Sequence, residues 1–273
     1  MGATQIQVEH LAVFHYPVPS PAKATARILL IHGMGEHHAR LHNAITAFQK
    51  QAYEVVAFDL RGMGQSQGRR MWIETFQDYV DDVRLTHDWI QHNLPPLKTF
   101  VMGHSLGGTI AIHFAAQVQN KIDGLLLSAP GFIAGAGISA IKIQLAKLLA
   151  RIAPGLRVKE SLDATALSRD PQVIADYRSD RLCCRFNTIR QGNEILRVLP
   201  EIPALARQIR VPTLIVHGES DRIVNPEGSQ QIIELINAKH KTLKLLLGTF
   251  HEPHNDINRA DNLKIILDWL RRF

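Results

Sequence analysis

The sequence contains little cysteine and no long apolar run. Its only two cysteines, Cys183 and Cys184, are adjacent among 273 residues, so we expect no disulfide framework and infer a reducing compartment. A membrane-spanning helix needs roughly 18 consecutive apolar residues, and no stretch of the sequence reaches that length. The segment from Met1 to Ile6 has neither the charged start nor the apolar run of a secretory signal. These absences together predict a cytoplasmic protein.

The sequence also lacks a block of like charges. Lys and Arg number 31 against 25 Asp and Glu, a formal charge of +6, and the excess is spread along the chain. Proteins that bind nucleic acid usually carry basic clusters, so we expect no nucleic-acid partner. A moderate, distributed positive charge favours approach to an anionic membrane surface or to an acidic substrate. We therefore expect transient contact with the inner face of a membrane.

Short apolar runs alternate with helical patterns over most of the chain. Continuous apolar runs are typical of strands buried on both faces of a parallel sheet. Their alternation with helices predicts an α/β fold, with a mostly parallel central sheet and helices on both faces. The predicted strands cover 27–32, 53–58, 99–102, 122–128, 212–217 and 242–247, after an opening strand or hairpin at 6–16.

The alternation stops after residue 130 and resumes near residue 207. Between these points the pattern is helical and no strand is predicted. We therefore predict that 1–130 and 207–273 form the core, and that 131–206 form a helical cap inserted over the strand ends.

The segment Gly-His-Ser-Leu-Gly at 103–107 lies between a predicted strand and a predicted helix. A strand-to-helix turn this sharp needs glycine at both flanks, and it exposes the central serine at the top of the sheet. Ser105 is therefore the candidate nucleophile. We interpret His104, inside the turn, as a packing residue.

A serine hydroxyl needs a base to remove its proton and an acid to orient that base. In sheets with this turn, the acid and then the histidine follow the serine along the chain. Asp221 lies a few residues beyond a predicted strand and is the favoured acid, with Glu219 as the rival. His251 closely follows the last predicted strand and is the favoured base, with His254 as the rival.

An oxyanion also needs preset hydrogen-bond donors. One is expected to be the backbone N–H of Leu106, at the start of the helix. The other is expected in the glycine-rich turn His-Gly-Met-Gly at 32–35, where we assign the backbone N–H of Met34.

Together these segments resemble the monoacylglycerol lipase and lysophospholipase family of α/β hydrolases. The resemblance implies an α/β-hydrolase fold with a helical cap, and it assigns the same nucleophile, acid, base and oxyanion donors. The sequence departs from the family pattern at Leu60, where the family often has His, and at Asp180-Arg181-Leu182, where it often has Asp-Pro-Leu. The segments that carry the resemblance are 32–37, 58–68, 103–108, 217–224 and 251–256.

The predicted cap begins with an amphipathic, basic helix. Its apolar stripe includes Ile138, Ile141 and Leu145, which we predict to bind substrate, and it continues through Leu148 and Ile152. Such a stripe lines an acyl tunnel, touches a lipid surface, or packs on the domain core.

The sequence predicts a serine hydrolase that cleaves the carboxylic esters of acyl lipids through an acyl-enzyme intermediate. The expected partner is a small-molecule lipid ester, either a monoacylglycerol or a lysophospholipid, with no metal and no cofactor. The alternatives are a thioesterase or acyltransferase with the same three side chains, or a carboxylesterase for small esters. A ligand-binding protein without activity would need a broken triad.

Overall fold

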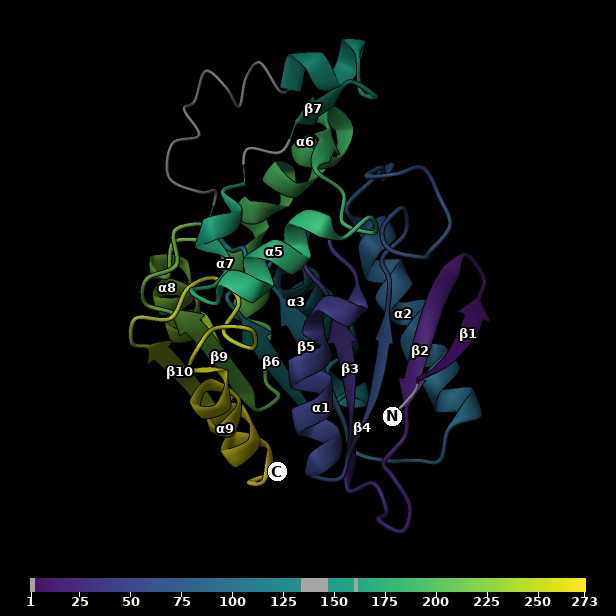
Figure 1. Ribbon diagram of the computed structural model, residues 1–273, viewed down its shortest axis with the longest axis vertical. Helices are drawn as coiled ribbons and strands as arrows, with labels where there is room; N and C mark the ends of the chain where they lie inside the picture. The colour runs from purple at the N-terminus through teal and green to yellow at the C-terminus, as the bar shows by residue number, and fades with distance from the viewer. Residues whose placement is uncertain (1–2, 134–146, 160–161) are drawn as a thin grey trace.

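The computed structural model describes residues 3–133, 147–159 and 162–273, and Figure 1 shows its architecture. A central sheet has eight strands in the order β1-β2-β4-β3-β5-β6-β9-β10. The six strands from β4 to β10 pair in parallel, whereas β1 and β2 form an antiparallel hairpin on one edge. The strands are β1 (Thr4–Val8), β2 (Leu11–Tyr16), β3 (Ala26–Ile31), β4 (Tyr53–Phe58), β5 (Thr99–His104), β6 (Gly124–Ser128), β9 (Thr213–Gly218) and β10 (Lys241–Leu246).

Helices cover both faces of this sheet, as the sequence predicts (Figure 1). One apolar core lies under α1 and α9, and another lies on the opposite face against α2, α3 and α8. Strands β3, β4 and β5 are buried along their whole length because both faces are covered. The helices are α1 (His42–Lys50), α2 (Gln77–Asn93), α3 (Leu106–Val118), α8 (Glu227–Leu235) and α9 (Arg259–Leu270).

The chain leaves the sheet between β6 and β9. The described part of this segment includes α5 (Pro171–Ser179), α6 (Ile189–Val198) and α7 (Ile202–Ala206). In Figure 1 most of the segment lies above one end of the sheet, while α7 returns to pack on α3.

The prediction that this segment has no strand is wrong. It contains β7 (Arg157–Lys159) and β8 (Phe186–Thr188), which pair antiparallel in a separate two-stranded sheet. Each strand has only three residues and β7 is fully exposed, so neither carries the apolar alternation that reveals a strand in a sequence. The predicted substrate-binding residues Ile138, Ile141 and Leu145 lie outside the described residues.

Candidate active site

The turn at Ser105 has a strained backbone that its surroundings fix in place. Ser105 has φ +52°, in the left-handed region that side chains rarely adopt. Its backbone N–H donates to the carbonyl of Ser128 on β6 (3.0 Å), and its carbonyl accepts from Gly108 and Gly131. A Cβ at Gly103 would collide with the carbonyl of Gly107. The flanking glycines are therefore required by space, as the sequence predicts.

The glycine-rich turn after β3 lies directly beside this serine. A Cβ at Gly33 would stand 2.8 Å from Glu36 Oε1 and 3.2 Å from Ser105 Cβ, so glycine at this position leaves room for both neighbours. The carbonyl of Gly35 accepts from the backbone N–H of Cys184 at 2.7 Å, which ties the turn to the inserted segment. Cys183 and Cys184 are both buried.

Asp221 and His251 follow β9 and β10, and they meet in a buried hydrogen bond. His251 Nδ1 lies 2.7 Å from Asp221 Oδ2 and must be the donor, because a carboxylate only accepts. The same oxygen accepts from His217 Nε2 at 3.1 Å, and the other accepts from the backbone N–H groups of Ile223 and Val224. Four donors therefore hold the carboxylate in one orientation.

Charge and burial set the protonation of this pair. Burial alone would raise the pKa of Asp221, but the His251 charge and the hydrogen bonds hold it well below its usual range. Burial alone would lower the pKa of His251, but the Asp221 carboxylate and then Glu252 and Glu36 carry it above its ordinary value. Asp221 is thus ionised, and the ring of His251 is stabilised in its protonated form.

Three of the candidate residues meet at one pocket, which has a volume of about 60 Å³. Ser105, His251 and Met34 line it, with Leu162, Leu167, Tyr177 and Ile223 supplied by the inserted segment and the loop after β9. The rivals named from the sequence do not line this pocket: Glu219 is exposed, and neither ring nitrogen of His254 has a hydrogen-bond partner among the described residues.

The His104 ring packs against the rings of both His251 and His254. The ring centroid of His104 lies 5.0 Å from that of His251 and 4.8 Å from that of His254. Burial holds the pKa of His104 well below its usual value and lowers the pKa of His254 to about 3. Both rings are therefore neutral neighbours, which agrees with the interpretation of His104 as a packing residue.

A buried ion cluster beside the pocket was not predicted from the sequence. Arg40 donates to both carboxylate oxygens of Glu252, at 2.7 and 2.8 Å, and its Nε lies 3.7 Å from Glu36. Glu36 accepts from the backbone N–H of Gly33 at 2.5 Å and so holds the turn beside Ser105. Burial and the Glu252 charge raise the pKa of Glu36 to about 7. The sequence did carry a signal for this cluster. Two charged residues, Glu36 and Arg40, closely follow the buried glycine-rich turn at 32–35.

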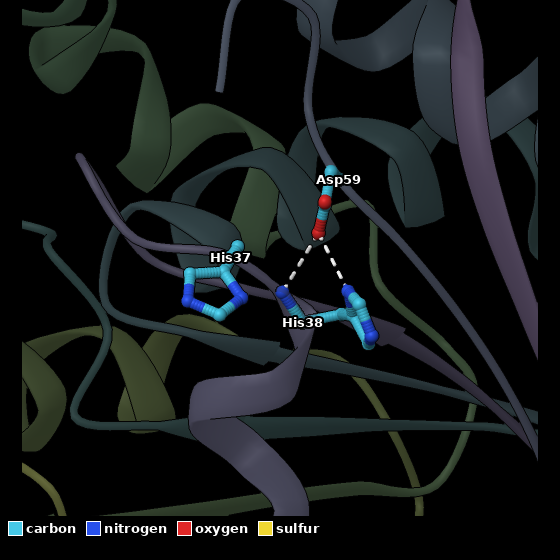
Figure 2. Close-up of side chains that lie close together, drawn as sticks. All are labelled: His37, His38 and Asp59. Carbon is cyan, nitrogen blue, oxygen red and sulfur yellow. Dashed lines mark hydrogen bonds and ion pairs between the residues drawn. The ribbon is translucent and has the colours of Figure 1, made fainter. Parts of the chain in front are cut away.

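Among the residues that the structure describes, two groups of side chains come close enough to ligate a metal ion. Figure 2 shows the first, in which His38 donates to Asp59 through both its backbone N–H and its Nδ1, each at 2.8 Å. In the second, His37 Nε2 lies 2.7 Å from the Asp180 carboxylate, near Cys183. In each group one histidine and one aspartate already hydrogen-bond each other, so each pair is explained as a link between loops.

Comparison with known proteins extends this picture over the whole chain. The profile of a family described as serine aminopeptidase, S33, matches residues 22–258. A monoacylglycerol lipase of Mycolicibacterium smegmatis is 31% identical over 245 residues, which are 89% of this chain and 87% of that protein. The phospholipase YtpA of Bacillus subtilis is 30% identical over 246 residues, which are 89% of this chain and 93% of that protein.

A solved structure leads to the same family. The crystal structure of a monoacylglycerol lipase from Paleococcus ferrophilus superposes with a TM-score of 0.85 and 29% identity, covering 95% of this chain and 98% of that one. The predicted fold class is therefore confirmed. The family profile runs from before β3 to the loop after β10, and the relatives cover most of the sequence. The chain therefore belongs to the monoacylglycerol lipase and lysophospholipase family of α/β hydrolases.

Proposed function

We propose that this carboxylic ester hydrolase cleaves acyl esters of glycerol, with Ser105 as nucleophile, His251 as base and Asp221 as the acid that orients it. The observation that carries the proposal is the 2.7 Å bond between His251 and Asp221, in a pocket that Ser105 also lines. The printed activities of the relatives, monoacylglycerol lipase and phospholipase, support an acyl lipid as the substrate.

In this proposal His251 Nε2 takes the proton of Ser105 Oγ while Oγ bonds to the ester carbonyl carbon. Nδ1 already donates to Asp221, so in the neutral ring Nε2 is the free acceptor. The proton then passes to the leaving alkoxide as the ester C–O bond breaks, and an acyl-enzyme remains. Water repeats the sequence, releases the fatty acid and restores the serine.

The oxyanion of each tetrahedral intermediate would be held by the backbone N–H groups of Leu106 and Met34. Leu106 begins α3, where helix N–H groups have no partner within the helix and the helix dipole favours negative charge. Met34 lines the pocket and lies next to Gly33, which is in close contact with Ser105. Fixed donors of this kind typically contribute about 10²- to 10³-fold to kcat.

A substrate series tests the function and separates it from its rivals. We expect 1-acylglycerols with medium or long chains to be cleaved with kcat/KM about 10-fold or more above butyryl glycerol, because apolar contact grows with each methylene. Acyl-CoA thioesters, short p-nitrophenyl esters and an added alcohol acceptor complete the set. Preference for the thioester, the short ester or the acceptor would replace the proposal, and a folded protein inactive on every ester would refute it.

We further propose that residues 147–159 touch a lipid surface, with 131–206 acting as the cap over the core. The segment carries four of the large apolar side chains that are exposed among the described residues, Leu148, Ile152, Leu156 and Val158, and Ile152 is 72% exposed. It also contains four Lys or Arg residues and no acidic residue. Apolar side chains among cations are typical of segments that lie on anionic lipid surfaces. None of the described helices has the length and apolarity needed to cross a membrane.

Vesicle binding tests this surface. The double variant Leu148→Ser and Ile152→Ser should bind phosphatidylglycerol vesicles about 10-fold more weakly or worse in cosedimentation, because it loses two inserted apolar side chains. Leu247→Ser is the matched control, since Leu247 is 82% exposed outside this segment. Equal weakening by the control, or no binding by the unchanged protein, would contradict the proposal.

A further inference from the structure

The pocket at Ser105 adjoins a second, outer pocket of about 250 Å³. The two share a wall made by Leu162 and Tyr177. The lining of the outer pocket is basic, and it consists of Lys159, Leu162, Asp163, Ala164, Tyr177, Arg178 and Arg185. A group that extends from an ester at Ser105 past this wall would therefore meet cationic side chains.

Three structural elements bring these cations together. Lys159 ends β7 and is in register with Phe186 of β8, so it stands across from the residue that follows Arg185. Arg185 donates from Nη2 to the carbonyl of Tyr177 on α5, at 3.4 Å. Arg178 is the next residue of α5. The cluster is thus set by backbone pairing and a side-chain contact to backbone.

Ion pairs among the described residues do not balance the charge of the outer pocket. Lys159, Arg178 and Arg185 are exposed, and none forms an ion pair with any residue in the described ranges. Among the described residues of the lining, Asp163 is the only acidic one, and its carboxylate accepts from Thr165 N–H at 2.9 Å and from Thr165 Oγ1 at 2.7 Å. Three like charges beside one engaged carboxylate leave a positive potential that an anion would satisfy.

We propose that the outer pocket binds the phosphate of a lipid head group while the acyl ester lies at Ser105. This inference rests on the proposed function. Arg178 and Arg185 offer planar guanidinium groups, whose paired N–H donors match phosphate oxygens, and Lys159 adds a point charge. The substrate class that fits this phosphate site is the anionic lysophospholipid, an acylglycerol that carries a phosphate. A neutral monoacylglycerol would have nothing for these cations to bind.

Substrate selectivity in neutral detergent micelles tests the site. For the double variant Arg178→Gln and Arg185→Gln, we expect the ratio of kcat/KM for oleoyl lysophosphatidate to that for oleoyl glycerol to fall by about 10- to 100-fold. The loss should lie mainly in KM for the lysophosphatidate. The double lysine variant should recover part of the ratio, because it keeps the charge but loses the paired donors. Arg84→Gln, an exposed arginine of α2 outside these pockets, is the matched control.

Further arms separate the sources of the anion. An unchanged ratio, or an equal fall for both substrates, would overturn the proposal. A loss of rate by the double variant only on anionic vesicles would also overturn it, because the cations would then act on the membrane surface. So would inhibition by inorganic phosphate that equals inhibition by glycerol phosphate, if the unchanged protein showed no preference for lysophosphatidate.

A binding measurement keeps this test independent of catalysis. Calorimetry of glycerol 3-phosphate with the Ser105→Ala protein should detect binding that is lost when Arg178 and Arg185 are also replaced by Gln. If no ester is cleaved but this binding is present, the proposed function fails and the anion site stands. If esters are cleaved without this binding or the selectivity, the anion site alone fails.

Discussion

Replacement of Ser105 by alanine is expected to lower kcat on acylglycerol by about 10⁴- to 10⁶-fold. The variant removes only Oγ, so the attacking atom is lost while the fixed turn is kept. The backbone bonds to Ser128, Gly108 and Gly131 do not involve the side chain. The melting temperature should therefore change little, and a fluorophosphonate that labels the unchanged protein should no longer attach.

A second buried serine provides the control. Ser128 lies on β6 next to the turn, and its Oγ has no hydrogen-bond partner among the described residues. Ser128→Ala should keep kcat within a few-fold. If Ser105→Ala retained more than about a tenth of the rate, or if mass spectrometry located the fluorophosphonate on another residue, the assignment of the nucleophile would be wrong.

The largest loss of stability is expected from Arg40→Leu, about 3–5 kcal/mol in the free energy of unfolding. Arg40 is the cation shared by Glu252 and Glu36, which are 2% and 5% exposed. Removing it leaves two buried carboxylates without a counter-charge. Urea unfolding at pH 8 measures the loss. Arg271→Leu is the control, because its ion pair with Asp268 is exposed and worth less than about 1 kcal/mol.

The pH dependence of this loss has a definite sign. The pKa of Glu36 is raised to about 7 from its ordinary value of 4.5, so between these values the folded state binds more protons than the unfolded state. Stability from this group therefore falls as pH rises through that window. Without Arg40 the pKa of Glu36 rises further, so Arg40→Leu should be less damaging at pH 6 than at pH 8. An equal loss at both values would contradict the account of the cluster.

The sequence predicts the fold well where structure follows from local pattern. Apolar runs located β3, β4, β5, β6 and β9 to within a few residues, because strands buried on both faces are apolar throughout. The edge strand β10 was located equally closely although it is only partly buried. The family and the ester-hydrolase class are confirmed by the comparisons. The turn at Ser105 was readable because its glycines are a requirement of space.

What was missed depends on contacts between distant parts of the chain. Arg40 and Glu252 are 212 residues apart, and only the closed sheet brings them into contact. The basic lining of the outer pocket comes from β7, α5 and the loop before β8. The strands β7 and β8 have three residues each, so they are too short or too exposed to show an apolar pattern in the sequence. Side-chain clusters such as these are assembled from several elements. They are therefore seen only in the structure, because no single segment of the sequence contains all their members.

The segment between β6 and β9 can change in sequence or length independently of the sheet. These two strands are hydrogen-bonded neighbours, with Leu125 opposite Thr213, although the chain between them is long. Under the proposed role of this segment as a cap, substitutions or length changes there are expected to alter which substrate is admitted while the pairing of β6 with β9 is kept. Proteins that share this fold can thus differ in substrate while keeping the same catalytic residues. Chimeras that exchange this segment between relatives would test this independence.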